Sequence, residues 1–243
     1  APEDVNAHIP PIYTYFGQFI DHDITASEDR NKESGDITAA FRPRPPDKVV
    51  SELKNKRRPA FDLDSVYGDG PSLGGADTEA KHFYDGVKLR VGSINTEAAV
   101  PLGHVRIPDE NDLERDLPRI GALIDAGVAT PADFPQDLQA DPAFRRLPWI
   151  GDLRNDENLI VAQLHLAFLR FHNRAVDWVD AHEPQEGDAA RFVRAQDLTR
   201  WHYQWLVVND FLRRLTYPGV LDAVLYGGRR FYNPRGRRTA PFM

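Results

Sequence analysis

Apolar residues recur at steps of three and four between Gly151 and Val179, and this feature limits the fold most. The series is Ile160, Leu164, Phe168, Phe171, Ala175 and Trp178. This spacing is the period of one face of an α-helix, so it predicts a long helix that buries this face. Asn155 is expected to cap the start of the helix. Asp156 and Glu157 then fall in its first turn, where the helix dipole favours carboxylates.

Apolar residues recur with the same helical spacing in residues 188–216, and this pattern predicts a second long helix. Its expected buried face is Ala195, Leu198, Trp201, Trp205, Val208, Leu212 and Leu215. The helix is expected to end near Tyr217-Pro218-Gly219, because proline cannot continue it and glycine permits the turn that follows.

The rest of the chain predicts little regular structure. Prolines and charged residues in 27–56 and prolines in 95–148 predict loops and short helices. Alternating Val87, Leu89 and Val91 predict one short strand or hairpin arm. The expected fold is therefore mainly α, with long loops and little β-strand.

Composition excludes several classes of protein. The chain has 243 residues, of which 41% are hydrophobic and 28% charged, as is typical of a globular protein with a substantial core. The formal net charge of −7 argues against a nucleic-acid-binding surface. No apolar run approaches the roughly 18 residues of a membrane span. Cysteine is absent, which excludes disulfides and thiolate ligands but leaves the cellular compartment undetermined.

The segment YFGQFIDHDIT, residues 15–25, gathers polar groups on a short predicted helix. Gln18, Asp21 and His22 are three or four positions apart and share one side, whereas Asp23 lies on another. A carboxylate, an imidazole and an amide on one side indicate a site that transfers a proton. The alternative is a solvated His-Asp pair on an amphipathic helix.

A second polar motif, FDLDSVYG, lies in the glycine-rich segment 57–75. Its Asp62, Asp64 and Ser65 offer oxygen atoms of the kind that calcium binds, together with backbone carbonyls, on a loop. The spacing is not that of an EF-hand, and an Asx-turn is the alternative interpretation. The motif is therefore a candidate cation loop.

Helix capping does not explain Arg154, which stands just before the positive end of the first long helix, where an anion is favoured. Glu157 follows it three residues later. His165 and His172 lie on one face of that helix, about 10 Å apart at about 1.5 Å of rise per residue. One ion would need further ligands to bridge them, so we expect both to be packing histidines. His202 is expected to be part of the scaffold too, with axial ligation as its alternative.

Together these motifs resemble the animal-type haem peroxidases, the peroxidase-cyclooxygenase superfamily, and in particular its bacterial members. YFGQFIDHDIT resembles the distal-histidine helix of that family, and FDLDSVYG resembles its calcium loop. Arg154-x-x-Glu157, followed by LHLAFLRFHNR, resembles the segment of the distal arginine. The resemblance covers nearly the whole chain and implies the helical fold of the family.

The resemblance implies a role for each candidate residue. His22 would be the distal base and Arg154 the distal arginine, both acting on hydrogen peroxide. Asn158 stands where the mammalian myeloid enzyme has the methionine of a third haem link, which implies a lower haem potential. Gln18 would be a polar residue that lines the cavity. Asp21 and Glu157 would be the two carboxylates that can esterify haem b. The three calcium ligands would be Asp23, Asp62 and Asp64.

The implied activity is a haem-dependent peroxidase that reduces hydrogen peroxide and oxidises a halide, thiocyanate or a small organic donor. Two alternatives are a fatty-acid oxygenase of the same superfamily and a non-catalytic, calcium-stabilised, haem-binding scaffold. An HD-type metal hydrolase is disfavoured, because further His and Asp ligands are not in a recognisable spacing. The family's proximal histidine lies downstream of the second long helix. Residues 1–243 are therefore expected to be the distal part of one domain, completed by a C-terminal segment or a second chain that carries this histidine.

Overall fold

The computed structural model describes residues 8–26, 45, 47, 55–58, 60–73, 79–92 and 115–228. Within these ranges the fold is mainly helical, as predicted, and β-structure is confined to one two-stranded hairpin and isolated bridges. None of the described helices has the length and hydropathy needed to cross a membrane. Most of the predicted loop 27–56, and residues 95–114 of the next, lie outside the described residues.

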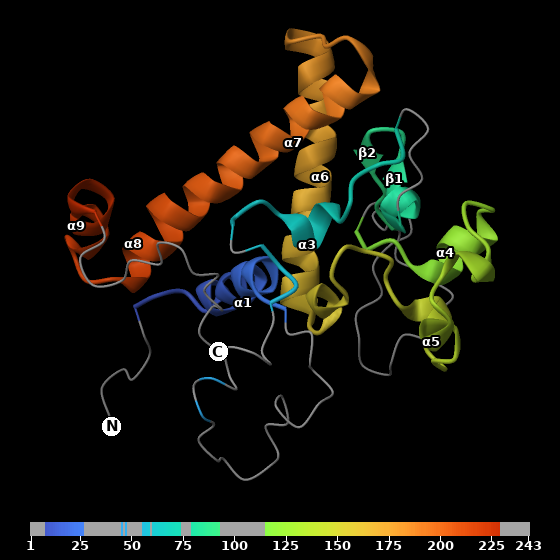
Figure 1. Cartoon of the computed structure of the whole chain (residues 1–243), viewed down its shortest axis with the longest axis horizontal. Coiled ribbons are helices and arrows are strands. Elements are labelled where there is room, and N and C mark those ends of the chain that lie inside the picture. Colours follow the sequence, from blue (N-terminus) through green and yellow to red (C-terminus); the bar gives the residue numbers. More distant parts are fainter. Residues whose placement is uncertain are drawn as a thin grey trace. The chain divides into compact units, whose positions relative to one another are not determined.

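Short helices and turns alternate along the chain before two long helices (Figure 1). The elements are α1 (Ile12–Ile24), α3 (Asp64–Tyr67), η1 (Glu79–Phe83), β1 (Tyr84–Asp85), β2 (Lys88–Leu89), α4 (Ile120–Asp125), η3 (Pro131–Asp133), α5 (Gln136–Gln139), η4 (Phe144–Arg146), η5 (Leu153–Asp156), α6 (Leu159–His182), α7 (Gly187–Leu206), the π-helical turn η6 (Val207–Phe211), α8 (Leu212–Leu215) and α9 (Val220–Gly227).

The chain divides into two compact units. The first unit comprises Ala1–Asp62 and Tyr203–Met243, and the second comprises Leu63–His202. The boundary between His202 and Tyr203 falls inside α7. That the whole chain is part of one domain stays a prediction.

The long helix α6 is confirmed, but its start differs from the prediction. Its N-cap is Asn158, whose side chain accepts a hydrogen bond from the Val161 N–H at 3.0 Å. Asn155 is instead fully buried in η5, a separate 3-10 turn that ends before the helix begins. The prediction that Asn155 caps the helix is therefore wrong, because Asn155 lies in this separate turn and the helix begins only at Leu159.

The predicted buried face of α6 is only partly correct. Ile160, Phe171 and Trp178 are 36%, 39% and 42% exposed, whereas Phe168 and Ala175 are buried. The buried face is Val161, Ala162, His165, Leu166, Phe168, Leu169, His172, Ala175, Val176 and Val179. A search for apolar residues alone passes over the two histidines at its centre and so places the face too far around the helix.

The short strand or hairpin arm predicted from Val87, Leu89 and Val91 is confirmed in part: Lys88–Leu89 forms β2, which pairs with β1 in an antiparallel hairpin. The Asn173 side chain on α6 accepts from the Leu89 N–H and donates to the Leu89 carbonyl, each at 2.8 Å. This double contact fixes the hairpin to α6. A second, smaller hydrophobic core consists of Ile120, Leu123, Ala129 and Phe134.

Helix α7 follows α6 after a short connection, from which the two helices diverge (Figure 1). Two ion pairs hold the connection: Arg191 with Asp180 at 2.7 Å and Arg194 with Glu183 at 2.6 Å. The predicted buried face of α7 is wrong at its two tryptophans, Trp201 and Trp205, which are 53% and 60% exposed. The buried residues here are Phe192, Ala195, Thr199, Tyr203 and Val207.

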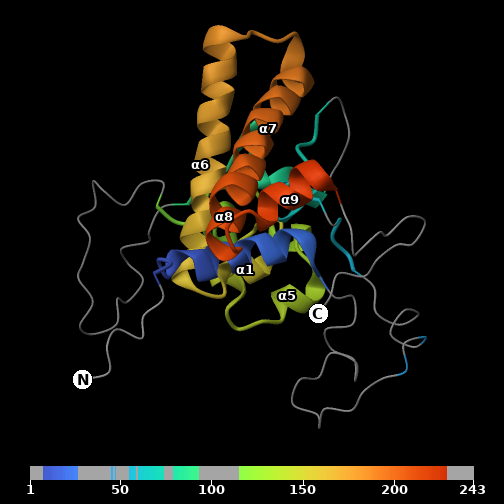
Figure 2. The same ribbon diagram turned by 90° about the vertical axis from the view of Figure 1, so that its left-hand side faces the viewer.

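The end of this helical region agrees with the predicted stop signal. The helix widens to the π-turn η6, continues as α8 to Leu215, and is followed by Gly219 with φ of 84° before α9. In the first unit, Phe16 of α1 packs edge-on against Phe211 of η6, with ring centroids 5.6 Å apart. Figure 2 shows the ribbon of α1 beside α8, the helix that follows η6. Phe16 and Phe19 also pack edge-on against Tyr203. Aromatic contacts thus fix α1 within this unit.

Candidate functional site

The last turn of α1 carries the residues predicted to transfer a proton. His22 is buried, with 5% of its surface exposed, and Gln18 is partly buried. Asp21 is exposed, and its carboxylate accepts a hydrogen bond from the Thr25 hydroxyl at 3.1 Å. Asp21 and His22 are therefore neighbours that differ in their access to solvent. Their shared role at a cofactor stays a prediction.

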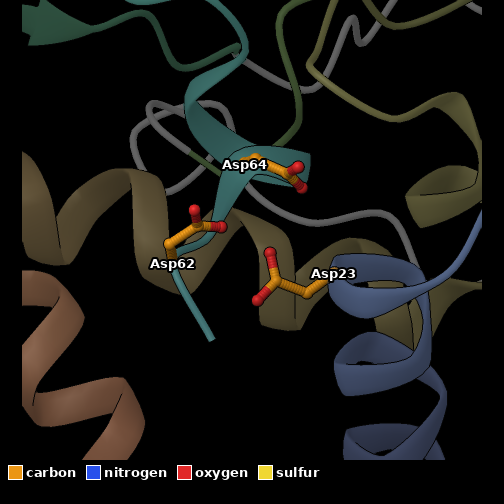
Figure 3. Close-up of side chains that lie close together, drawn as sticks. All are labelled: Asp23, Asp62 and Asp64. Carbon is orange, nitrogen blue, oxygen red and sulfur yellow. The ribbon is translucent and has the colours of Figure 1, made fainter. Parts of the chain in front are cut away.

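Asp23, Asp62 and Asp64 lie close together, as the predicted calcium site requires (Figure 3). Each offers a carboxylate oxygen, and these oxygens all lie within 4.8 Å of one another. Asp23 is fully buried at the end of α1, and the other two are partly buried. Carboxylates at this separation repel one another when ionised, and a bound cation would offset the repulsion.

The loop that carries Asp62 and Asp64 has an unusual backbone. Leu63, between them, has φ of 58° and ψ of 36°, the left-handed region that L-residues with a side chain rarely adopt. Its side chain is fully buried. Asp64 then begins the short helix α3, so part of the predicted loop is helical.

Arg154 lies in η5, and Asp152 binds its guanidinium group. Arg154 Nε donates to both oxygens of the Asp152 carboxylate, at 3.0 and 3.2 Å, and Nη2 donates to Oδ2 at 2.6 Å. The Asp152 Oδ1 atom also accepts from the Arg154 backbone N–H at 3.0 Å and thereby caps the turn. The two side chains are 18% and 7% exposed. Arg154 is therefore held at both its backbone and its side chain by one carboxylate.

Neighbouring contacts fix the rest of η5. The Asn155 amide nitrogen lies 2.8 Å from His165 Nδ1, and Arg119 binds Asp156 at 2.6 Å. Gly151 approaches the Ser65 backbone so closely that a Cβ atom there would lie 2.5 Å from the Ser65 carbonyl oxygen. The segment that carries Arg154 is thus anchored before and within the turn.

Glu157, the second predicted haem carboxylate, is exposed directly after η5. Its backbone N–H donates to the Arg154 carbonyl at 3.1 Å. Arg154 and Glu157 therefore belong to one locally ordered segment of the second unit. His22 and Asp21 form a corresponding pair of neighbours in the first unit.

The two buried histidines of α6 are hydrogen-bonded within the core, in agreement with their predicted packing role. His172 accepts from the Tyr67 hydroxyl at Nδ1 (3.1 Å) and donates from Nε2 to the Val87 carbonyl (2.9 Å). Burial lowers the pKa of His172 to about 4, although the bond to Val87 opposes this. Burial likewise lowers the pKa of His165 to about 3, against the nearby charge of Asp152. Both rings are therefore neutral at pH 7.

Inspection of the sequence did not identify Asp152 and Asn155 as residues that shape the site. The available signal for Asp152 is its position two residues before Arg154, since aspartate is a favoured N-cap residue. Asn155 carries no such signal, because its partner His165 follows ten residues later on another element.

Residues 127–235, which include Arg154, Glu157 and both long helices, match the family model for animal haem peroxidases. No curated protein matches the chain significantly. The match agrees with the mainly helical fold and includes the Arg154 segment, whereas the motifs at 15–25 and 57–75 lie outside it. Over residues 127–235, the chain is therefore similar to the animal haem peroxidase family.

Proposed function

We propose that the chain is part of a haem-dependent peroxidase that reduces hydrogen peroxide and oxidises a halide, thiocyanate or a small organic donor. The observation that carries the proposal is that the segment matching the peroxidase family contains Arg154, whose guanidinium is held by Asp152. A fixed cation is what the cleavage of peroxide requires, because negative charge develops on the departing oxygen.

The donor groups of the chain fit a haem. In α1 the buried imidazole of His22 is next to the exposed carboxylate of Asp21, and in the second unit Arg154 is followed by the exposed Glu157. We infer that Asp21 and Glu157 would hold the haem, through esters to its methyl groups. When bound, haem supplies the iron that activates peroxide and stores the oxidising equivalents for the donor.

The side chains of the protein supply the proton transfer and the charge. In the proposed reaction, the His22 imidazole takes a proton from hydrogen peroxide and returns it to the departing oxygen, which leaves as water. Such general acid–base transfer typically contributes about 10²–10⁴-fold to the rate. Arg154 stabilises the negative charge on the same oxygen, an effect often worth about 10²–10³-fold. Gln18, one turn before His22, is proposed to provide a polar contact to the bound peroxide.

The proposal is tested by loading the protein, together with the segment or second chain expected to carry the proximal histidine, with haem and measuring its rate constant for reaction with hydrogen peroxide by stopped flow. We expect His22→Ala and Arg154→Ala each to lower it by at least about 10²-fold. Arg145→Ala is a matched control, since Arg145 pairs only with the exposed Asp125 among the ion pairs described. Haem uptake without any reaction with peroxide would refute the proposal. Oxygen uptake with a fatty acid in its place would favour the oxygenase.

We further propose that Asp23, Asp62 and Asp64 bind calcium. The proposal rests on their convergent carboxylates, the oxygen type that calcium prefers. Calcium should raise the melting temperature of the wild type, because a ligand that binds only the folded state stabilises it. Asp62→Asn should lose most of this increase, whereas Asp69→Asn, an exposed acid of the same loop, should keep it. An equal calcium response in both variants would contradict this assignment.

A further inference from the structure

We propose that Asp152 is a positioning residue, which fixes the orientation of the Arg154 guanidinium for the reaction with peroxide. The inference rests on the proposed function and adds a residue to it. Asp152 touches Arg154 through both carboxylate oxygens, with contacts of 2.6 to 3.2 Å, and its side chain is only 7% exposed. The geometry is that of a planar fork binding a carboxylate, which fixes direction as well as distance.

The Asp152 carboxylate has two tasks, the cap and the guanidinium contact, and Oδ1 takes part in both because it also accepts from Arg154 Nε at 3.0 Å. Oδ1 accepts from the Arg154 backbone N–H at 3.0 Å, which is the ordinary hydrogen bond of an N-cap. An asparagine in the same position can make that bond. Oδ2 binds the Nη2 atom of the guanidinium at 2.6 Å, and this contact gains its strength from the negative charge. The cap therefore does not require a carboxylate, but the hold on the Arg154 side chain does.

The backbone beneath Arg154 is already fixed without this contact. Asn155 is bound to His165, Asp156 is bound to Arg119, and Gly151 lies against the Ser65 backbone. The long side chain of Arg154 has many torsions, and the contacts with Asp152 restrict the directions in which its charged group can point. A charge already aimed at the reacting atoms does not need to reorganise during the reaction.

The first test needs no haem. In the apo-protein, the Arg154 Nε–H should give a slowly exchanging ¹⁵N NMR signal, assigned by its loss in Arg154→Lys. In Asp152→Asn this signal should shift and exchange with solvent at least about 10-fold faster, because the charged acceptor is lost. Asp125→Asn is the matched control, as it removes the same charge from an exposed pair with Arg145. An unchanged Arg154 signal in Asp152→Asn would overturn the inference.

The second test uses the haem-loaded protein and a double-mutant cycle. Asp152→Asn should lower the rate constant with peroxide about 10-fold while leaving the melting temperature close to that of the wild type, because asparagine keeps the cap. Added to Arg154→Ala, it should have no further effect, since Asp152 acts through Arg154. Equal losses in both backgrounds would assign Asp152 a merely structural role and overturn the inference. If the wild-type protein does not react with peroxide, the proposed function and the catalytic part of this inference are both refuted. Whether Asp152 orients Arg154 is decided by the NMR signal alone.

Discussion

Acidification from pH 7 to pH 5 should destabilise the fold through His165 and His172, the two buried histidines of α6. Burial lowers their pKa values to about 3 and about 4, against about 6.5 for an exposed histidine. Between these values the unfolded chain binds protons that the folded chain does not bind. Stability therefore rises with pH in this window and is lost as the pH falls below about 6.5.

The size of the effect follows from the same pKa values. Each pH unit below about 6.5 costs about 1.4 kcal/mol for a histidine that stays neutral in the folded state. From pH 7 to pH 5 this amounts to about 2 kcal/mol for each ring, or about 4 kcal/mol for the pair. Carboxylates contribute little in this range, since their ordinary pKa values are about 4.

The assay is urea denaturation of the wild type and His172→Gln at pH 7 and pH 5. Glutamine can still donate to the Val87 carbonyl, the partner of His172 Nε2, but it does not titrate. The variant is expected to be less stable at pH 7 but to lose only about half as much stability on acidification as the wild type does. An identical loss in the two proteins would show that His172 is protonated in the folded state, and would refute the reasoning.

Three further substitutions test individual contacts. Gly151→Ala should cost about 1–3 kcal/mol in the free energy of unfolding, because its Cβ would lie 2.5 Å from the Ser65 carbonyl oxygen; a melting curve matching the wild type would contradict this. Asn158→Ala should cost about 1 kcal/mol through loss of the cap on Val161, with Asn158→Asp as the tolerated control in the same denaturation assay. Arg119→Lys should lower the melting temperature, since an ammonium group cannot reproduce the planar guanidinium contacts with two aspartates. An unchanged melting temperature would show that these partly buried contacts contribute little to stability.

The sequence predicted the existence of the main elements better than the faces they bury. Helical periodicity correctly indicated α6, and Pro218 with Gly219 correctly indicated where the next helical region ends. The buried faces were harder to predict because polar residues, including His172 and Thr199, occupy core positions with their hydrogen bonds satisfied. Apolar spacing cannot reveal partners that lie on other elements.

The same limit applied to the candidate site. Motifs identified Arg154 and the three aspartates Asp23, Asp62 and Asp64, and the structure brings those aspartates together. Asp152 was missed because its function is to hold another side chain, and a contact of that kind is visible only when the local turn is known. Sequence motifs thus indicate candidate groups, whereas the residues that hold those groups in place depend on tertiary contacts.

The left-handed backbone of Leu63 has a consequence for the neighbouring acids. A leucine in this conformation costs roughly 1–2 kcal/mol, which complete burial of its side chain outweighs. Burial of the Leu63 side chain therefore determines which residue adopts the left-handed conformation. That conformation in turn sets the directions of the Asp62 and Asp64 side chains. Leu63, whose side chain carries no oxygen, thus sets the arrangement of the neighbouring carboxylates, so its replacement by glycine would loosen this arrangement without removing a single carboxylate.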